Sequence, residues 1–123
     1  MYDKFLTVFC LALGLSLAFA GGAYAADHLI VQKNKSFEAN GVAIDDIKVK
    51  VGDSLTFTNN DMVTHNIYSR DPGNEFEIPK QLPGVTASVV MKTRGEVNIR
   101  CAIHPKMKLH VTVEPNAPVA PRH

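Results

Sequence analysis

Short runs of alternating apolar and polar residues, separated by turn residues, recur along this chain and constrain its fold. The run Ile47-Lys48-Val49-Lys50-Val51 alternates with a period of two, which is typical of a half-buried β-strand. Gly52-Asp53 indicates a turn, and Leu55-Thr56-Phe57-Thr58 alternates again before the turn residues Asn59-Asn60-Asp61. Further strands are expected at 29–31, 65–68, 85–91, 96–100 and 109–113. Because no run of helix length shows a 3.6-residue period, the pattern predicts an all-β antiparallel sandwich.

The two ends of the chain differ in composition from its middle. Residues 5–20 form an apolar run, and Ala23-Tyr24-Ala25 has the small-x-small pattern of a signal-peptidase site, so residues 1–25 are expected to be a cleaved secretory signal peptide. The run is shorter than the roughly 20 residues needed to span a bilayer, which favours cleavage over a membrane anchor. The tail 115–123 is rich in proline and is expected to be disordered. One domain remains, at residues 26–114, with no membrane span.

The cysteine count and the charge narrow the choice of function. Loss of the signal segment removes Cys10 and leaves Cys101 as the single cysteine of the predicted domain. An exported domain with one cysteine cannot form an internal disulfide, so this thiol is expected to be reactive, intermolecular or a metal ligand. The net charge of the whole chain is +1, which gives no argument for nucleic acid or an anionic membrane as a partner.

The segment Cys101-Ala102-Ile103-His104-Pro105-Lys106-Met107 carries three side chains that bind copper: a thiolate, an imidazole and a thioether. With one more imidazole they would complete a blue-copper centre, in which two His and one Cys form a trigonal plane and Met is a weak axial ligand. Taken singly, Cys101 and Met107 would more often be core residues. Their combination with His104 predicts a site for one copper ion that cycles between Cu(I) and Cu(II).

His65 is the best candidate for the second imidazole, by elimination. His28 precedes the first strand and His123 lies in the tail, so neither suits a preorganised site. His110 is out of phase with the apolar residues of its strand and is expected on the solvent face. The predicted metal ligands are therefore His65, Cys101, His104 and Met107.

Two residues next to the ligands are expected to support them. Pro105 follows His104 and stiffens the loop, because its ring fixes φ. Asn66 follows His65 and has two interpretations. Its amide ties the upstream strand to the backbone near Cys101, or it is an ordinary polar residue at a strand edge.

These motifs resemble the cupredoxin family, in particular its amicyanin-type members with a short ligand loop and its plastocyanin-like proteins. Residues 47–57 are similar to the strand–turn–strand unit before the first ligand, and His65-Asn66 matches the family's His-Asn pair. The spacing Cys101-x-x-His104-Pro105-x-Met107 matches the short loop. The resemblance implies a Greek-key sandwich of about seven to eight strands. It also implies that His65, Cys101 and His104 are equatorial copper ligands and that Met107 is axial.

The same resemblance implies a function. It points to a non-enzymatic, monomeric protein of the periplasm that passes single electrons between transient redox partners, such as a c-type cytochrome or a periplasmic dehydrogenase. Its loop histidine would be exposed within a docking patch. The residues expected in that patch are Met62, Val63, Pro72, Pro105 and Lys106. Copper storage or delivery is the alternative, because it would use the same ligand types. Arg100 and Lys106 depart from the family's pattern and leave the partner's identity open.

Overall fold

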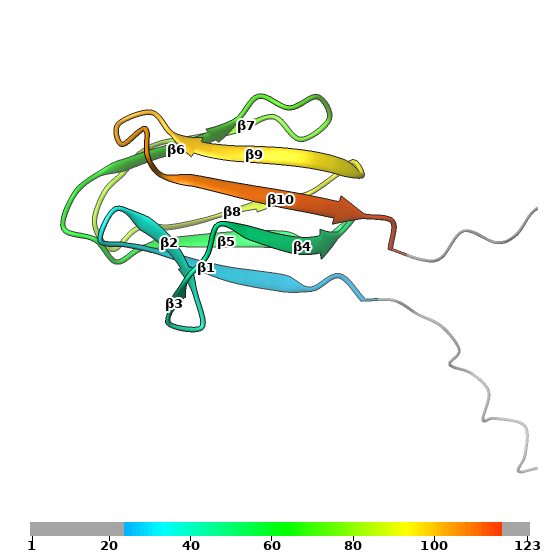
Figure 1. Ribbon diagram of the computed structural model, residues 1–123, viewed down its shortest axis with the longest axis horizontal. Helices are drawn as coiled ribbons and strands as arrows, with labels where there is room; N and C mark the ends of the chain where they lie inside the picture. The colour runs from blue at the N-terminus through cyan, green and yellow to red at the C-terminus, as the bar shows by residue number, and fades with distance from the viewer. Residues whose placement is uncertain (1–23, 117–123) are drawn as a thin grey trace, which may run out of the picture.

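The computed structural model describes residues 24–116, which form two five-stranded sheets packed face to face (Figure 1). The strands are β1 (Asp27–Lys33), β2 (Ser36–Ala39), β3 (Val42–Ala43), β4 (Asp46–Lys50), β5 (Ser54–Asn59), β6 (His65–Ser69), β7 (Phe76–Gln81), β8 (Thr86–Val90), β9 (Gly95–Cys101) and β10 (Lys108–Glu114). The strand order is β3-β2-β1-β5-β8 in one sheet and β4-β10-β9-β6-β7 in the other. The predicted all-β sandwich is confirmed.

Two strand pairs depart from the antiparallel arrangement that the sequence predicted. Strand β1 pairs with β5 in parallel, and β10 pairs with β4 in parallel. The remaining pairs in both sheets are antiparallel. The strand nearest each end of the described chain therefore lies inside a sheet, with a hydrogen-bonded neighbour on both sides.

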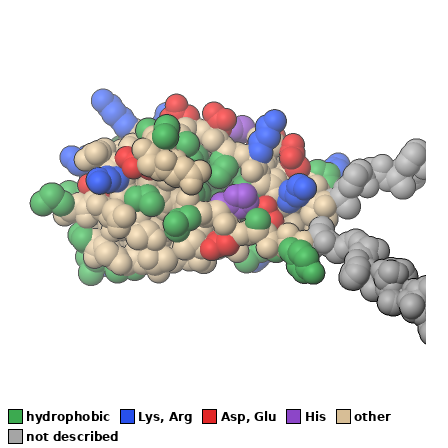
Figure 2. Space-filling model, turned by 90° about the horizontal axis from the view of Figure 1, so that it is seen from below, with side chains coloured by type: hydrophobic (Ala, Val, Ile, Leu, Met, Phe, Trp, Pro, Cys, Tyr) green, Lys and Arg blue, Asp and Glu red, His purple; other side chains and the backbone are tan. Residues whose placement is uncertain are grey.

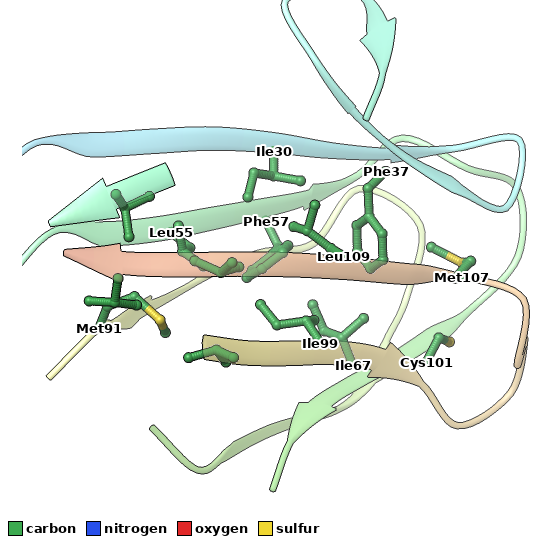
Figure 3. Close-up of a cluster of buried hydrophobic side chains, with 14 residues drawn as sticks. Ile30, Phe37, Leu55, Phe57, Ile67, Met91, Ile99, Cys101, Met107 and Leu109 are labelled. Carbon is green, nitrogen blue, oxygen red and sulfur yellow. The ribbon is translucent and has the colours of Figure 1, made fainter. Parts of the chain in front are cut away.

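The core lies between the sheets and is built from alternate residues of the long strands. Leu55 and Phe57 of β5 face it, and Phe57 contacts Phe37 edge to face, with ring centroids 6.1 Å apart. Figure 3 shows Ile67 and Ile99 among the buried side chains of this layer, on β6 and β9. Burial of such side chains supplies the main driving force for folding.

Three strands were not expected from the sequence. Strands β2 and β3 form a small hairpin at the edge of the first sheet, after a tight turn in which Asn34 and Lys35 have φ values of 53° and 55°. Strand β7 contains Pro79, which cannot donate a hydrogen bond to a neighbour. Because β7 is an edge strand paired only with β6, this position is tolerated.

One end of the sandwich, on the left in Figure 1, collects four connections that we call the site end. They join β1 to β2, β5 to β6, β7 to β8 and β9 to β10. Within residues 24–116 the structure contains no helix that could span a membrane. Residues 1–23 of the predicted signal segment and residues 117–123 of the predicted tail lie outside the described residues. Both segments therefore remain predictions.

Candidate metal centre

Three of the four predicted ligands meet at the site end. His65 is the first residue of β6 and Cys101 is the last residue of β9, and these strands are antiparallel neighbours. His104 lies in the connection from β9 to β10. The Cys101 Sγ atom lies 3.8 Å from Nδ1 of His65 and 3.9 Å from Nδ1 of His104. Ligand atoms of the three residues all lie within 4.8 Å of one another.

These distances fit a single first-row metal ion. With metal–nitrogen and metal–sulfur bonds of about 2.0 and 2.3 Å, a trigonal plane puts nitrogen and sulfur about 3.7 Å apart. His65 is fully buried, Cys101 is 2% exposed and His104 is half-buried. The donor set of one thiolate and two imidazoles suits copper. The residues therefore form a compact site whose donors are already grouped.

Met107 lies at the end of the ligand loop and is 2% exposed. Figure 3 shows its side chain at the same end of the buried cluster as Cys101. The main-chain N–H of Met107 donates to the carbonyl of His104 over 2.9 Å, which closes the loop into a turn. Pro105, between them, is exposed. Met107 therefore lies at the site end with the other three predicted ligands.

The tie between the two ligand strands is made by the main chain of Asn66. Its N–H donates to Cys101 Sγ over 3.4 Å, and its carbonyl accepts the N–H of Ala102 over 2.9 Å. The amide oxygen Oδ1 is buried without a hydrogen-bond partner. The backbone of Asn66 makes these bonds to Cys101 and Ala102, whereas one of the two interpretations of the sequence assigned such a link to the amide. This N–H places a hydrogen-bond donor at the sulfur of a predicted metal ligand.

Asp61 is a supporting residue that the sequence did not identify. Its Oδ2 lies 3.0 Å from Nε2 of His65, and its oxygens accept the main-chain N–H groups of Lys35 over 2.8 Å and Met62 over 3.1 Å. Burial raises the pKa of Asp61, but these donors lower the pKa by more, so the carboxyl stays ionised. Asp61 thus fixes the His65 ring with Nδ1 facing the sulfur. Nothing in the sequence distinguishes it from other acidic turn residues.

The loop that carries Asp61 is held by a buried amide. Asn59 accepts the N–H of Asp61 over 2.8 Å at Oδ1, and its Nδ2 donates to the carbonyls of Val63 over 2.9 Å and Gln81 over 2.8 Å. Asn59 is fully buried and Gln81 is 1% exposed. Since every partner lies in or beside a site-end connection, these bonds rigidify the surroundings of His65.

The lowered pKa of His104 favours metal binding. Burial lowers the pKa of His104, the electrostatic effects of His65 and Lys35 lower this pKa further, and Asp61 opposes them with a smaller effect. The neutral imidazole is the form that ligates a metal. The His65 and His104 rings lie with centroids 5.0 Å apart.

The other histidines lie away from the site. His28 Nε2 contacts Asp53 Oδ2 at 2.9 Å, beyond the other end of β5. His110 is half-buried, with Nε2 2.7 Å from Glu96 Oε1. His123 lies outside the described residues.

Similarity to known proteins shows which family this chain belongs to. No protein-family model matches the chain. The methylamine utilization protein MauL of Methylorubrum extorquens is 31% identical over 102 residues, which are 82% of this chain and 90% of MauL. A purple cupredoxin from Nitrosopumilus maritimus is 29% identical, with a TM-score of 0.58, and the match covers 72% of this chain and 100% of the other. The chain belongs to the cupredoxin family. A Cu(I) structure of an amicyanin mutant shares the fold, with 21% identity, a TM-score of 0.61 and coverage of 72% and 82%.

The surface around the metal centre of this cupredoxin differs from the predicted docking patch at one position. Met62 is 91% exposed, Pro105 and Lys106 are exposed and Val63 is half-buried, all in site-end connections. Pro72 lies at the other end, next to Gly73, whose carbonyl accepts a hydrogen bond from Thr93 over 3.3 Å. The reason is that β6, with its five residues, carries the chain about 13 Å away from His65. Pro72 was therefore placed wrongly.

Two exposed apolar residues that the sequence did not identify lie at the site end instead of Pro72. Ile103 in the ligand loop is 50% exposed, and Leu82 in the connection from β7 to β8 is 54% exposed. Figure 2 shows hydrophobic side chains projecting at the left end of the molecule, beside Lys and Arg side chains. The site end thus presents apolar groups with a margin of positive charge.

Proposed function

We propose that this cupredoxin is a blue-copper electron-transfer protein of the periplasm. In this proposal His65, Cys101 and His104 hold one copper ion and Met107 is the axial ligand. The observation that carries the proposal is that the buried Cys101 Sγ lies 3.8 Å from Nδ1 of His65 and 3.9 Å from Nδ1 of His104. Membership of the cupredoxin family supports the same conclusion.

The residues around the centre are suited to a donor set that keeps its shape. Copper bound here would supply a one-electron couple between Cu(I) and Cu(II). His65 and Cys101 stand on paired strands and are held by the Asp61 and Asn66 contacts. Because a hydrogen bond holds each of these two side chains in place, little movement of the ligands is needed when the charge of the metal ion changes.

We further propose that the protein is a carrier and not an enzyme. Met107, Cys101 and His65 are all buried, with at most 2% of each exposed. With four protein ligands, no coordination position is left for a substrate, which metal-assisted hydrolysis or oxygen chemistry needs. Half-buried His104 is the ligand nearest to solvent and is the proposed exit for the electron.

The partner is proposed to be another exported redox protein. Met62, Leu82, Ile103 and Pro105 offer an apolar surface, and Lys106 adds a positive charge at its margin. Such a small surface suits a transient complex of a monomer with a c-type cytochrome or a periplasmic dehydrogenase.

Spectra of the copper-loaded protein test this function. We expect an intense visible band from thiolate-to-copper charge transfer, absent from Cys101→Ser and strongly altered in His65→Gln. His110→Gln is the matched control, since it removes a histidine that pairs with Glu96 outside the site. A colourless copper complex of the wild type would refute the proposal.

The alternative of copper storage or delivery is separated by a redox cycle. An electron carrier keeps its copper through repeated reduction and oxidation, with the visible band returning in full each time. Transfer of copper to a chelator on reduction would instead favour delivery.

A further inference from the structure

A buried carboxylate binds the N-terminal strand at the end of the sandwich remote from the metal centre. Asp53, in the turn between β4 and β5, is 5% exposed. Its Oδ1 accepts the main-chain N–H of Ala26 over 2.9 Å, and its Oδ2 accepts the N–H of Lys50 over 2.9 Å. His28 Nε2 lies 2.9 Å from the same Oδ2. Burial raises the pKa of Asp53, but these donors lower the pKa by more, so the group is an anion at neutral pH.

Ala26 is the residue at which the described chain joins the fold. Its carbonyl accepts the N–H of Ser54 over 2.9 Å, and strand β1 begins at the next residue. The two residues before it, Tyr24 and Ala25, are exposed. They line a surface hollow together with Gly52, Asp53 and a further basic residue, Lys50. Ala26 is exposed as well, but its N–H and its carbonyl are both hydrogen-bonded to the fold, so the bond between Ala25 and Ala26 directly precedes anchored chain.

We infer that Asp53 is a preformed binding site for a new N-terminus. This N-terminus is created when the chain is cleaved after Ala25. Hydrolysis by a signal peptidase breaks the amide bond between Ala25 and Ala26. The hydroxyl of water goes to the carbonyl carbon of Ala25, and its proton goes to the nitrogen of Ala26. The freed amine takes a further proton at neutral pH and becomes an α-ammonium group. This cation arises at the nitrogen that Asp53 already binds.

Processing strengthens an existing contact, because a neutral N–H donor becomes a charged one. Charge-assisted hydrogen bonds are shorter and roughly twice as strong as neutral ones. Before cleavage His28 is the titratable side chain in contact with Asp53, and it is positive only when protonated. After cleavage the carboxylate has a cationic partner throughout the neutral range. Asp53 is buried but Ala26 is exposed, so solvent screens the pair in part.

The direction of the pH dependence follows from this pairing. The Asp53 anion favours the charged amine, so the α-amino pKa in the folded state lies above the ordinary value of about 7.7–8.0. A group whose pKa is raised by folding adds stability that is fully present below its unfolded pKa. That stability is lost as the pH rises through the folded pKa.

The first test is the N-terminus of the exported protein. The full chain is expressed in a bacterium with a working export pathway, and the processed product is analysed by mass spectrometry. We expect the chain to begin at Ala26. A start at any other residue would overturn the inference, because the ammonium would then not face Asp53.

The second test measures the contact. NMR titration of the processed protein is expected to give an α-amino pKa above the ordinary range, returning to that range in Asp53→Asn. A variant with one serine inserted between Ala25 and Ala26 keeps Asp53 and all its neutral contacts, but moves the amine away by one residue. We expect a lower melting temperature for this variant at pH 7 and no difference at a pH above the folded α-amino pKa. Equal melting at pH 7, or an α-amino pKa that ignores Asp53→Asn, would refute the inference. The visible spectrum of the distant copper site reports whether each variant has folded.

Discussion

Substitution of Asp61 by asparagine tests whether a carboxylate behind His65 prepares the metal site. The change keeps the shape of the side chain but removes its charge and one of its two acceptor oxygens. In the wild type these oxygens serve three N–H groups, from Lys35, Met62 and the His65 ring. Asparagine has one acceptor oxygen, so at least one donor will face the NH2 group.

The expected magnitude has two parts. A hydrogen bond to a charged group contributes about 1.5–3 kcal/mol, so the free energy of unfolding of the metal-free protein should fall by about that amount. Only the contact with His65 affects the metal directly. Loss of a group that orients a metal-binding histidine typically costs about 10- to 100-fold in affinity. That range corresponds to about 1.4–2.7 kcal/mol of binding free energy.

Copper affinity is measured by competition with a chelator of known strength, for Asp61→Asn and for Glu114→Gln. Glu114 is exposed at the far end of β10, and the control removes one negative charge without touching the site. The visible band should persist in both variants, because the ligands are unchanged. If Asp61→Asn binds copper as tightly as the control, the carboxylate does not orient His65 and the reasoning fails.

Three further substitutions test the fold. Phe57→Ala removes a fully buried ring between the sheets and should lower the free energy of unfolding by about 3–5 kcal/mol in urea denaturation, and a loss below about 1 kcal/mol would contradict the packing. Gly73→Ala should destabilise the protein in thermal melts, since φ is +87° and a Cβ atom would lie 2.6 Å from Oγ1 of Thr93; an unchanged melting temperature would show that the turn can relax. The pKa of Asp53 is lowered in the fold, so its contribution is present above the unfolded pKa and lost as the pH falls through the folded pKa. Asp53→Asn should therefore be less stable than the wild type near neutral pH but lose less stability on acidification, and parallel stability–pH curves would contradict this.

The sequence predicted those features of the fold that depend on local patterns. Strands β5, β9 and β10 alternate cleanly because one face packs in the core and the other faces outward. Strand β7 was missed because Pro79 interrupts it and its burial is irregular. The parallel pairing of β1 with β5 could not be foreseen, since pairing direction is set by the packing of distant segments.

In the candidate site, too, features that depend on local sequence could be predicted, whereas features that depend on distant segments could not. Cys101, His104 and Met107 lie within one short loop, so their proximity follows from chain connectivity. His65 could be selected only by excluding other histidines, because its position depends on the pairing of β6 with β9. Asp61 was missed, since its role depends on a side-chain direction that a sequence does not contain.

The interior position of β1 and β10 has a consequence for how the chain reaches its folded state. Ile30 in β1 pairs with Phe57, and Val111 in β10 pairs with Ile47, so each sheet needs partners far apart along the sequence. Non-local pairing of this kind slows folding, because the loop-closure entropy is lost before the contacts form. The second sheet is not complete until β10 has arrived, and that strand directly follows the ligand loop. We therefore expect the loop that carries Cys101, His104 and Met107 to reach its folded arrangement late, when the second sheet closes.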